Sequence, residues 1–183
     1  MNEQKSTSDI AKVMGCSENK INYWLKKFGI PKRTISEAIY LKKNPDGDPF
    51  CFRMPKTQEE AILFGMGIGL YWGEGTKANG NTVRLGNSDP KLIRKFMDFL
   101  VTFFGVDERD FRYHLHIFSD IDINRARKYW MNELGIEKNQ FYKPTVTHTG
   151  KLGTYRHKST YGVLTIYYGN IKLRNKLIEL VPM

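Results

Sequence analysis

Apolar residues recur at helical or strand spacing along the second half of the chain, and these patterns predict its elements. Residues 90–104 carry apolar side chains three and four positions apart after a capping residue, Asp89 or Ser88, which predicts an amphipathic helix. Residues 111–118 alternate, with Tyr113, Leu115 and Ile117 on one side, so a half-buried strand is expected. The same patterns predict further helices at 123–134 and 171–181, and strands at 145–149 and 161–168.

The stretch TQEEAILFGMGIGLYWGEG at residues 57–75 has an unusual glycine pattern. Thr57 and Glu60 form a capping-box sequence, so we expect a helix to begin there. Gly65, Gly69 and Gly73 recur every fourth residue with Gly67 between them, and four interior glycines cost roughly 3 to 4 kcal/mol relative to alanine. A helix face without side chains lets a second backbone approach closely. The apolar run is too short to cross a bilayer, which favours a tight helix crossing in a water-soluble protein.

Residues 6–33 have the pattern of a helix-turn-helix. A short helix at 8–14 is followed by the turn residue Gly15 and by a second helix through about residue 28. The second helix has an apolar side formed by Ile21, Trp24, Leu25 and Phe28, and a third helix at 36–43 would close the small core. We expect polar side chains of this unit to contact base edges and phosphates. They are those of Ser17, Asn19, Lys20, Asn22, Tyr23, Lys26, Lys27 and Arg33. An ordinary helical hairpin with a polar face is the alternative.

The turn-rich sequence NPDGDP indicates a boundary between two domains. We predict a helix-turn-helix unit at 1–43, a linker at 44–56 and a second domain at 57–183. The net charge is +10, and basic ends flank a nearly neutral middle, which favours nucleic acid over membrane as the partner. A solvated basic surface is the alternative. Cys16 and Cys51 are isolated, so we expect a cytosolic protein without disulfides.

Residues 67–75, GIGLYWGEG, resemble the LAGLIDADG motif of homing endonucleases and their non-cutting relatives. Gly69 and Leu70 match its Gly-Leu pair, and Glu74 and Gly75 match its closing acid and glycine. The chain departs from the motif at Trp72 and in having Glu rather than Asp at position 74. The resemblance implies an α+β fold with an αββαββα core, here with an inserted helix, following the small all-α unit. Residues 76–81 contain a turn at Ala78, Asn79 and Gly80 between two short extended arms, the second of them at 82–86, and these arms would be its first two strands.

In that family the motif helices form the central interface and their closing acids bind divalent metal. The resemblance therefore implies a homodimer in contact at Gly65, Gly69, Leu70 and Gly73. It also implies Mg²⁺, or another divalent cation, held by the two Glu74 carboxylates with backbone groups near Gly73 and Gly75. The expected reaction is hydrolysis of both strands of a near-palindromic double-stranded DNA site, with no small-molecule substrate and no membrane partner.

The outward face of the strands would contact DNA. On this face we expect Lys77, Thr82, Arg84, Arg112, His114 and His116, together with Thr145, Thr147, Thr165 and Tyr167. A basic loop would reach phosphates further out through Lys151, Arg156, His157 and Lys158. The family also uses a polar, often basic residue beside the scissile phosphate, and the sequence does not place it. Asn87, Ser88, Lys77 or Lys158 would be substitutes.

The same sequence features allow three alternatives to a DNA endonuclease. A DNA-binding transcription regulator would keep the scaffold without cutting. An RNA-binding maturase would stack unpaired bases on the tyrosines of residues 161–168. Finally, Gly65, Gly69 and Gly73 would be only a packing face within one chain, with Glu74 left as a surface carboxylate.

Overall fold

A computed structural model describes residues 5–78, 81–148 and 159–182, apart from the side chain of Ile35. The chain divides into two compact units, Met1–Pro49 and Phe50–Met183. The fold is α+β, with seven α-helices and one four-stranded mixed sheet among the described residues. No helix in this part of the chain is long and apolar enough to cross a membrane.

The first unit contains the three helices expected from the sequence. They are α1 (Thr7–Val13), α2 (Glu18–Lys27) and α3 (Ile35–Lys43). Each begins at a hydroxyl residue, because the side chains of Ser6, Ser17 and Thr34 accept backbone N–H groups of the first turn. Gly15 supplies the left-handed conformation between α1 and α2 with φ of +59°. The helix-turn-helix prediction is therefore confirmed at the level of its helices and turn.

The packing of this unit is sparser than the apolar pattern predicted. Ala11 is its only buried hydrophobic residue within the described positions. Ile21 and Leu25 are half-buried, but Trp24 is exposed and Phe28 is 67% exposed, so the predicted apolar side of α2 is only half used. None of the described side chains of α3 is buried, and the expected role of α3 in closing the core is not fulfilled.

The second unit begins with residues 50–56, which were expected to belong to a linker. Cys51 and Arg53 donate backbone hydrogen bonds to the carbonyls of Phe104 and Phe103, at 3.0 and 2.9 Å. The Phe52 ring packs on Phe64 and Phe104. These contacts place the segment against the second unit.

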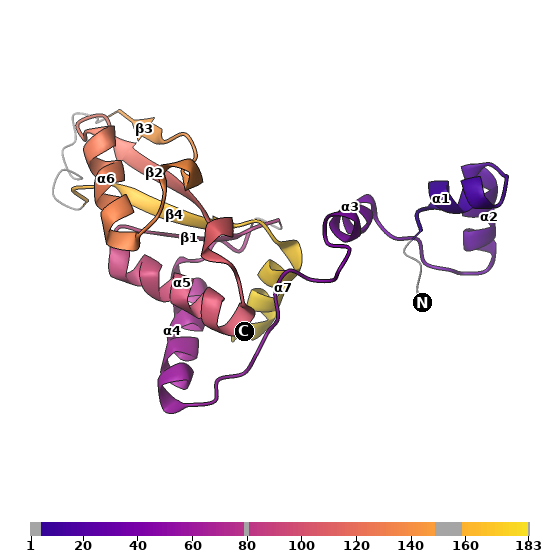
Figure 1. Ribbon diagram of the computed structural model, residues 1–183, viewed down its shortest axis with the longest axis horizontal. Coiled ribbons are helices and arrows are strands. Elements are labelled where there is room, and N and C mark those ends of the chain that lie inside the picture. The colour runs from indigo at the N-terminus through magenta and orange to yellow at the C-terminus, as the bar shows by residue number, and fades with distance from the viewer. Residues whose placement is uncertain (1–4, 79–80, 149–158, 183) are drawn as a thin grey trace. The chain divides into compact units, whose positions relative to one another are not determined.

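The second unit is a sheet covered on one face by helices (Figure 1). Its sheet has the order β1-β4-β2-β3, in which β1 and β2 are antiparallel to β4 and β3 is parallel to β2. Two short 3₁₀ helices, Glu108–Asp110 and Lys138–Gln140, lie in its connections. In chain order the other elements are α4 (Gln58–Glu74), β1 (Val83–Asn87), α5 (Pro90–Phe104), β2 (Arg112–Phe118), α6 (Ile123–Leu134), β3 (Thr145–Thr147), β4 (Val163–Tyr168) and α7 (Ile171–Leu180).

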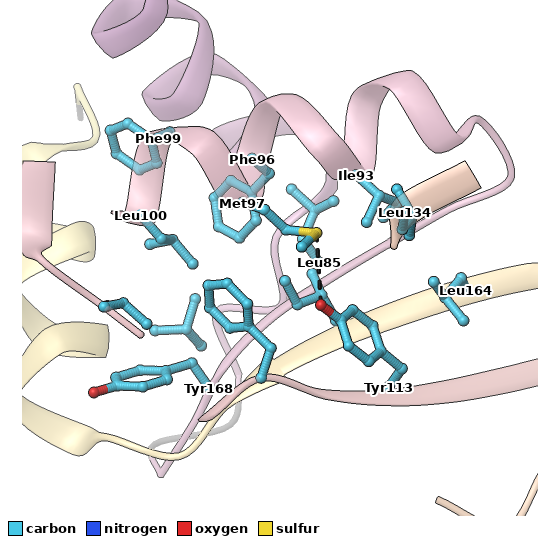
Figure 2. Close-up of a cluster of buried hydrophobic side chains, with 14 of the residues drawn as sticks. Leu85, Ile93, Phe96, Met97, Phe99, Leu100, Tyr113, Leu134, Leu164 and Tyr168 are labelled. Atoms are coloured by element: carbon cyan, nitrogen blue, oxygen red, sulfur yellow. Dashed lines mark hydrogen bonds between the residues drawn. The ribbon is translucent and has the colours of Figure 1, made fainter. Parts of the chain in front are cut away.

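The core lies between α5 and the inner face of the sheet. Figure 2 shows the α5 side chains, including Phe96 and Met97, facing Leu85, Tyr113 and other strand residues. The Tyr113 hydroxyl donates to Met97 Sδ at 3.6 Å, so this buried phenol has a partner. The predicted alternation of β2 and the predicted apolar stripe of α5 are both confirmed by their burial.

Two predictions for α4 and the segment that follows it differ from the structure. Among the described residues between α4 and α5, only β1 forms a strand. Where the first arm was expected, the chain makes a hydrogen bond from Thr76 N to Arg84 O at 3.0 Å and, just before it, an isolated bridge between Gly75 and Leu85. The expected capping box of α4 is also incomplete. Thr57 accepts from Glu60 N, but the Glu60 carboxylate instead binds Arg53 and Lys56 N.

Candidate nucleic-acid interface and carboxylate site

The glycines of α4 lie on two different sides of the helix. A Cβ added at Gly67 would lie 2.1 Å from Cγ of Phe99, so Gly67 lets α5 pack closely against α4. Added at Gly65, Gly69 or Gly73, a Cβ would have no atom of the described residues within 4 Å. Among the described residues of the second unit, these three glycines therefore form an open face.

Exposed apolar side chains border this glycine face. Ile62 is 58% exposed and Trp72 is 54% exposed, and Met66 is exposed between them. Their spacing with Gly65, Gly69 and Gly73 follows the helical repeat, so they share one side of α4. Leu70, predicted at the same interface, is instead half-buried and packs against the core. We use the name glycine stripe for Ile62, Gly65, Met66, Gly69, Trp72 and Gly73.

Glu74 is the last residue of α4 and is exposed at the end of the glycine stripe. Within the part of the chain that the structure describes, its carboxylate has no hydrogen bond or ion pair. Gly75 is buried and ends the helix, donating its N–H to Tyr71 O at 3.0 Å. No three potential metal-ligating side chains of described His, Cys, Asp or Glu residues come together in one copy. A divalent cation at Glu74 would therefore need further ligands, from backbone carbonyls such as those near Gly73 and Gly75, a second copy, solvent or substrate.

Two cations lie close to the C-terminal end of α4. Lys77 donates a side-chain hydrogen bond to the Trp72 carbonyl, and Arg174 of α7 donates to the Lys77 carbonyl. Arg174 Nε is buried without a hydrogen-bond partner among the described residues, and so is the Tyr71 hydroxyl. Burial raises the pKa of Tyr71, and the charge of Arg174 partly opposes this effect. Sequence reasoning considered Lys77 here but missed Arg174, because α7 is distant in sequence and has no motif.

The outer face of the sheet collects the strand residues predicted to contact DNA. Arg84 of β1 and Arg112 of β2 both lie opposite Tyr167 of the intervening β4, and Thr165 lies opposite His114. These side chains are half-buried, whereas their strand neighbours are buried in the core. None of the outward-facing positions of β1 to β4 carries a carboxylate. Arg84, Arg112, His114, Thr165 and Tyr167 therefore share one face, whose charge is positive, whereas Lys77 lies at the end of α4. Contact of this face with DNA stays a prediction.

Histidine and threonine side chains are paired across β2 and β3. The Nε2 atoms of His114 and His116 lie 2.9 and 2.7 Å from the hydroxyls of Thr145 and Thr147. Burial lowers the pKa of His114 below its usual range, and the nearby His116 adds to this effect. Thr82 is held in the same region, since its hydroxyl accepts from Arg84 Nε at 2.7 Å.

The residues predicted on the helix-turn-helix unit have several different environments. Asn19, Lys20, Tyr23, Lys26 and Lys27 are exposed on α2, and Lys27 Nζ lies 4.8 Å from the Trp24 ring centre. Ser17 caps α2 with its hydroxyl. Asn22 is half-buried, and its Oδ1 has no hydrogen-bond partner in the described part of the chain. Arg33 donates to the Lys5 carbonyl.

The predicted basic loop lies outside the described residues, and with it Lys151, Arg156, His157 and Lys158. No family model, curated protein or solved structure matches this chain. The resemblance at residues 67–75 therefore rests on those residues themselves.

Proposed function

We propose that this protein is a divalent-metal-dependent DNA endonuclease of the single-motif LAGLIDADG type, acting as a homodimer on a near-palindromic duplex. The observation that carries the proposal is the open glycine stripe of α4, which ends at the Glu74 carboxylate, unpartnered among the residues that the structure describes. A second copy is the proposed occupant of the stripe. Glycine on both helices permits backbones to approach more closely than other residues allow.

A symmetric crossing at the stripe would bring two Glu74 carboxylates together. Like charges at short distance repel, so the pair needs a cation or a shared proton. A divalent cation bound there would lower the pKa of a water and stabilise the leaving oxygen of a phosphodiester. Arg174 and Lys77 lie at the same end of α4 and supply positive charge for the scissile phosphate. They are our candidates for the basic group that the motif alone does not place.

The outer sheet face supports the DNA-binding part of the proposal. Arg84 and Arg112 provide fixed positive charge, and threonine and histidine side chains provide hydrogen-bonding groups on the same face. Phosphate contacts would position the duplex, and contacts to base edges would select its sequence. The four-stranded sheet that follows α4 supports a LAGLIDADG-like arrangement with α6 as the inserted helix, although its order departs from αββαββα in having one described strand, β1, between α4 and α5.

A non-cutting DNA-binding regulator is the second candidate, and the helix-turn-helix unit favours it. The helices α1 and α2, the Gly15 turn and the exposed lysines of α2 suit binding in a major groove without any cleavage chemistry. The two candidates share the DNA partner and the dimer, and they differ in whether Glu74 takes part in a reaction.

The test is incubation of the purified protein with a randomised duplex library and with its flanking genomic DNA, in Mg²⁺ and in EDTA. The endonuclease proposal predicts double-strand cleavage in Mg²⁺ that is abolished by EDTA and by Glu74→Gln. The matched control is Glu133→Gln, which alters an exposed glutamate of α6 and should cleave like the unaltered protein. Enrichment of a palindrome without cleavage, unchanged by Glu74→Gln, would establish the regulator instead.

A further inference from the structure

The tyrosines of residues 161–168 lie in different environments. Tyr168 is buried in the core, and Tyr161 stacks on Tyr129 with ring centres 3.8 Å apart. Tyr161 also accepts a hydrogen bond from Trp130 Nε1 through its carbonyl. Only Tyr167 among the tyrosines of β4 faces outward from the sheet. Of the β4 tyrosines, only Tyr167 is therefore placed to stack on an unpaired base.

A second tyrosine, which sequence reasoning missed, lies against Tyr167. The ring centres of Tyr142 and Tyr167 are 5.6 Å apart, and their planes meet at 83°. Tyr142 is held beside β2 because its backbone N–H donates to Tyr113 O at 2.8 Å. Since β2 separates this segment from β4, the Tyr142 side chain extends across the outer face to reach Tyr167. Tyr142 remains 50% exposed.

One positive group lies over the Tyr167 ring, and a second lies on the neighbouring strand β2. The Arg84 guanidinium lies over the Tyr167 ring, with Cζ 4.9 Å from its centre. Arg112 lies opposite Tyr167 on the other side, and its guanidinium donates to the carbonyls of Arg109 and Phe111. The guanidinium of Arg112 is thus held at the end of β2. The corner between the two tyrosine rings has an exposed aromatic surface beside fixed cations and, at the outward strand positions, no carboxylate.

We propose that the Tyr142–Tyr167 corner binds an unpaired nucleobase, with Arg84 and Arg112 attracting the adjoining phosphates. In an intact duplex both faces of a base are covered by its neighbours, so an exposed tyrosine ring cannot stack on it. An unpaired base offers its face to an aromatic ring whatever its sequence. The inference rests on the proposed nucleic-acid role of this sheet face, and it adds that the bound strand is unpaired at one position.

The test compares binding of two labelled single strands, oligothymidylate and oligouridylate of about twenty nucleotides, with binding of a duplex of the same length. Tyr142→Ala should weaken single-strand binding about 5- to 100-fold, because it removes one base–aromatic stack. Tyr142→Phe keeps the ring and should bind within about twofold of the unaltered protein. Met54→Ala removes an exposed apolar side chain outside the strands and should have no effect. The two strands distinguish DNA from RNA as the source of the base.

A 2-aminopurine base in the single strand provides a second readout. Its fluorescence should fall on binding to the unaltered protein and to Tyr142→Phe, but not on binding to Tyr142→Ala. Equal single-strand affinity of Tyr142→Ala and the unaltered protein would overturn the inference. Duplex binding without single-strand binding would overturn it as well, while leaving the proposed function intact. Binding of neither probe would overturn both.

Discussion

Replacing Gly69 by alanine should stabilise the folded monomer and weaken dimerisation. Gly69 is helical, and a Cβ at this position would meet no atom of the described residues within 4 Å. An alanine in an exposed helix interior stabilises the helix by about 1 kcal/mol relative to glycine. In the monomer we therefore expect the free energy of unfolding to rise by about that amount.

The same methyl group should interfere with a second helix. Where two backbones cross at glycines, an added methyl group overpacks the contact at a cost of about 1–3 kcal/mol. The dimer dissociation constant of Gly69→Ala should therefore rise by about tenfold or more. A more stable monomer together with a weaker dimer is expected only if the glycine face is uncovered in the monomer and covered by a second copy in the dimer.

The matched control is Gly67→Ala on the other side of the same helix. Its Cβ would lie 2.1 Å from the ring of Phe99, which is fully buried and has no space to move. Overpacking of about 1–3 kcal/mol would cancel or exceed the helical gain. We expect the monomer with Gly67→Ala to be unchanged or less stable by up to about 2 kcal/mol.

Urea unfolding followed by circular dichroism gives the free energy of unfolding, at a protein concentration where the chain is monomeric. Sedimentation velocity over a range of higher concentrations gives the dissociation constant. Loss of monomer stability in Gly69→Ala would show that the protein's own chain packs on the stripe. An unchanged dissociation constant would show that the stripe is not the interface. Either result would refute the reasoning.

Three other predictions concern charge and capping. The Arg53 guanidinium and the Lys56 N–H lower the pKa of Glu60 to about 2, so their stabilisation is complete above about pH 4.5 and is lost as the pH falls towards about 2. Unfolding measured across that range should show a smaller loss in Glu60→Gln than in the unaltered protein. Because burial and the nearby His116 lower the pKa of His114, DNA affinity measured by anisotropy should rise as the pH falls, at a pH below that at which an ordinary histidine gains its proton. His114→Gln should reduce that rise. Ser17→Ala removes the cap of α2 and should destabilise the first unit by about 1 kcal/mol in thermal unfolding.

The elements that were predicted correctly are those determined by the local pattern of apolar, capping and glycine residues. The stripe of α5 and the alternation of β2 depend on burial against a single face, and both are present as expected. The caps and glycine turn of the helix-turn-helix depend on local hydrogen bonds and backbone conformation, so they too were predictable. The glycine spacing of α4 predicted a face without side chains, which the structure leaves open.

The remaining features depend on partners that are distant in sequence. Nothing local indicates that β3 is parallel to β2, or that Arg174 reaches the end of α4. Tyr142 lies outside the predicted strands, and its backbone hydrogen bond to Tyr113 and its ring contact with Tyr167 place it on the sheet face. Helical spacing predicted a buried Trp24, but the small first unit offers too little apolar surface to cover it.

Cysteine cross-linking at position 74 tests the central claim most directly, because a dimer through the glycine stripe places two copies of Glu74 side by side. Cys16 and Cys51 are free, so both are first replaced by serine. Glu74→Cys in this background should form a disulfide-linked dimer under mild oxidation, since that bond requires Cα atoms about 4.4–6.8 Å apart. Glu133→Cys on α6 is the control and should remain monomeric on a non-reducing gel. A Glu74→Cys protein that cross-links no faster than Glu133→Cys would contradict the proposed dimer and the shared metal site that depends on it.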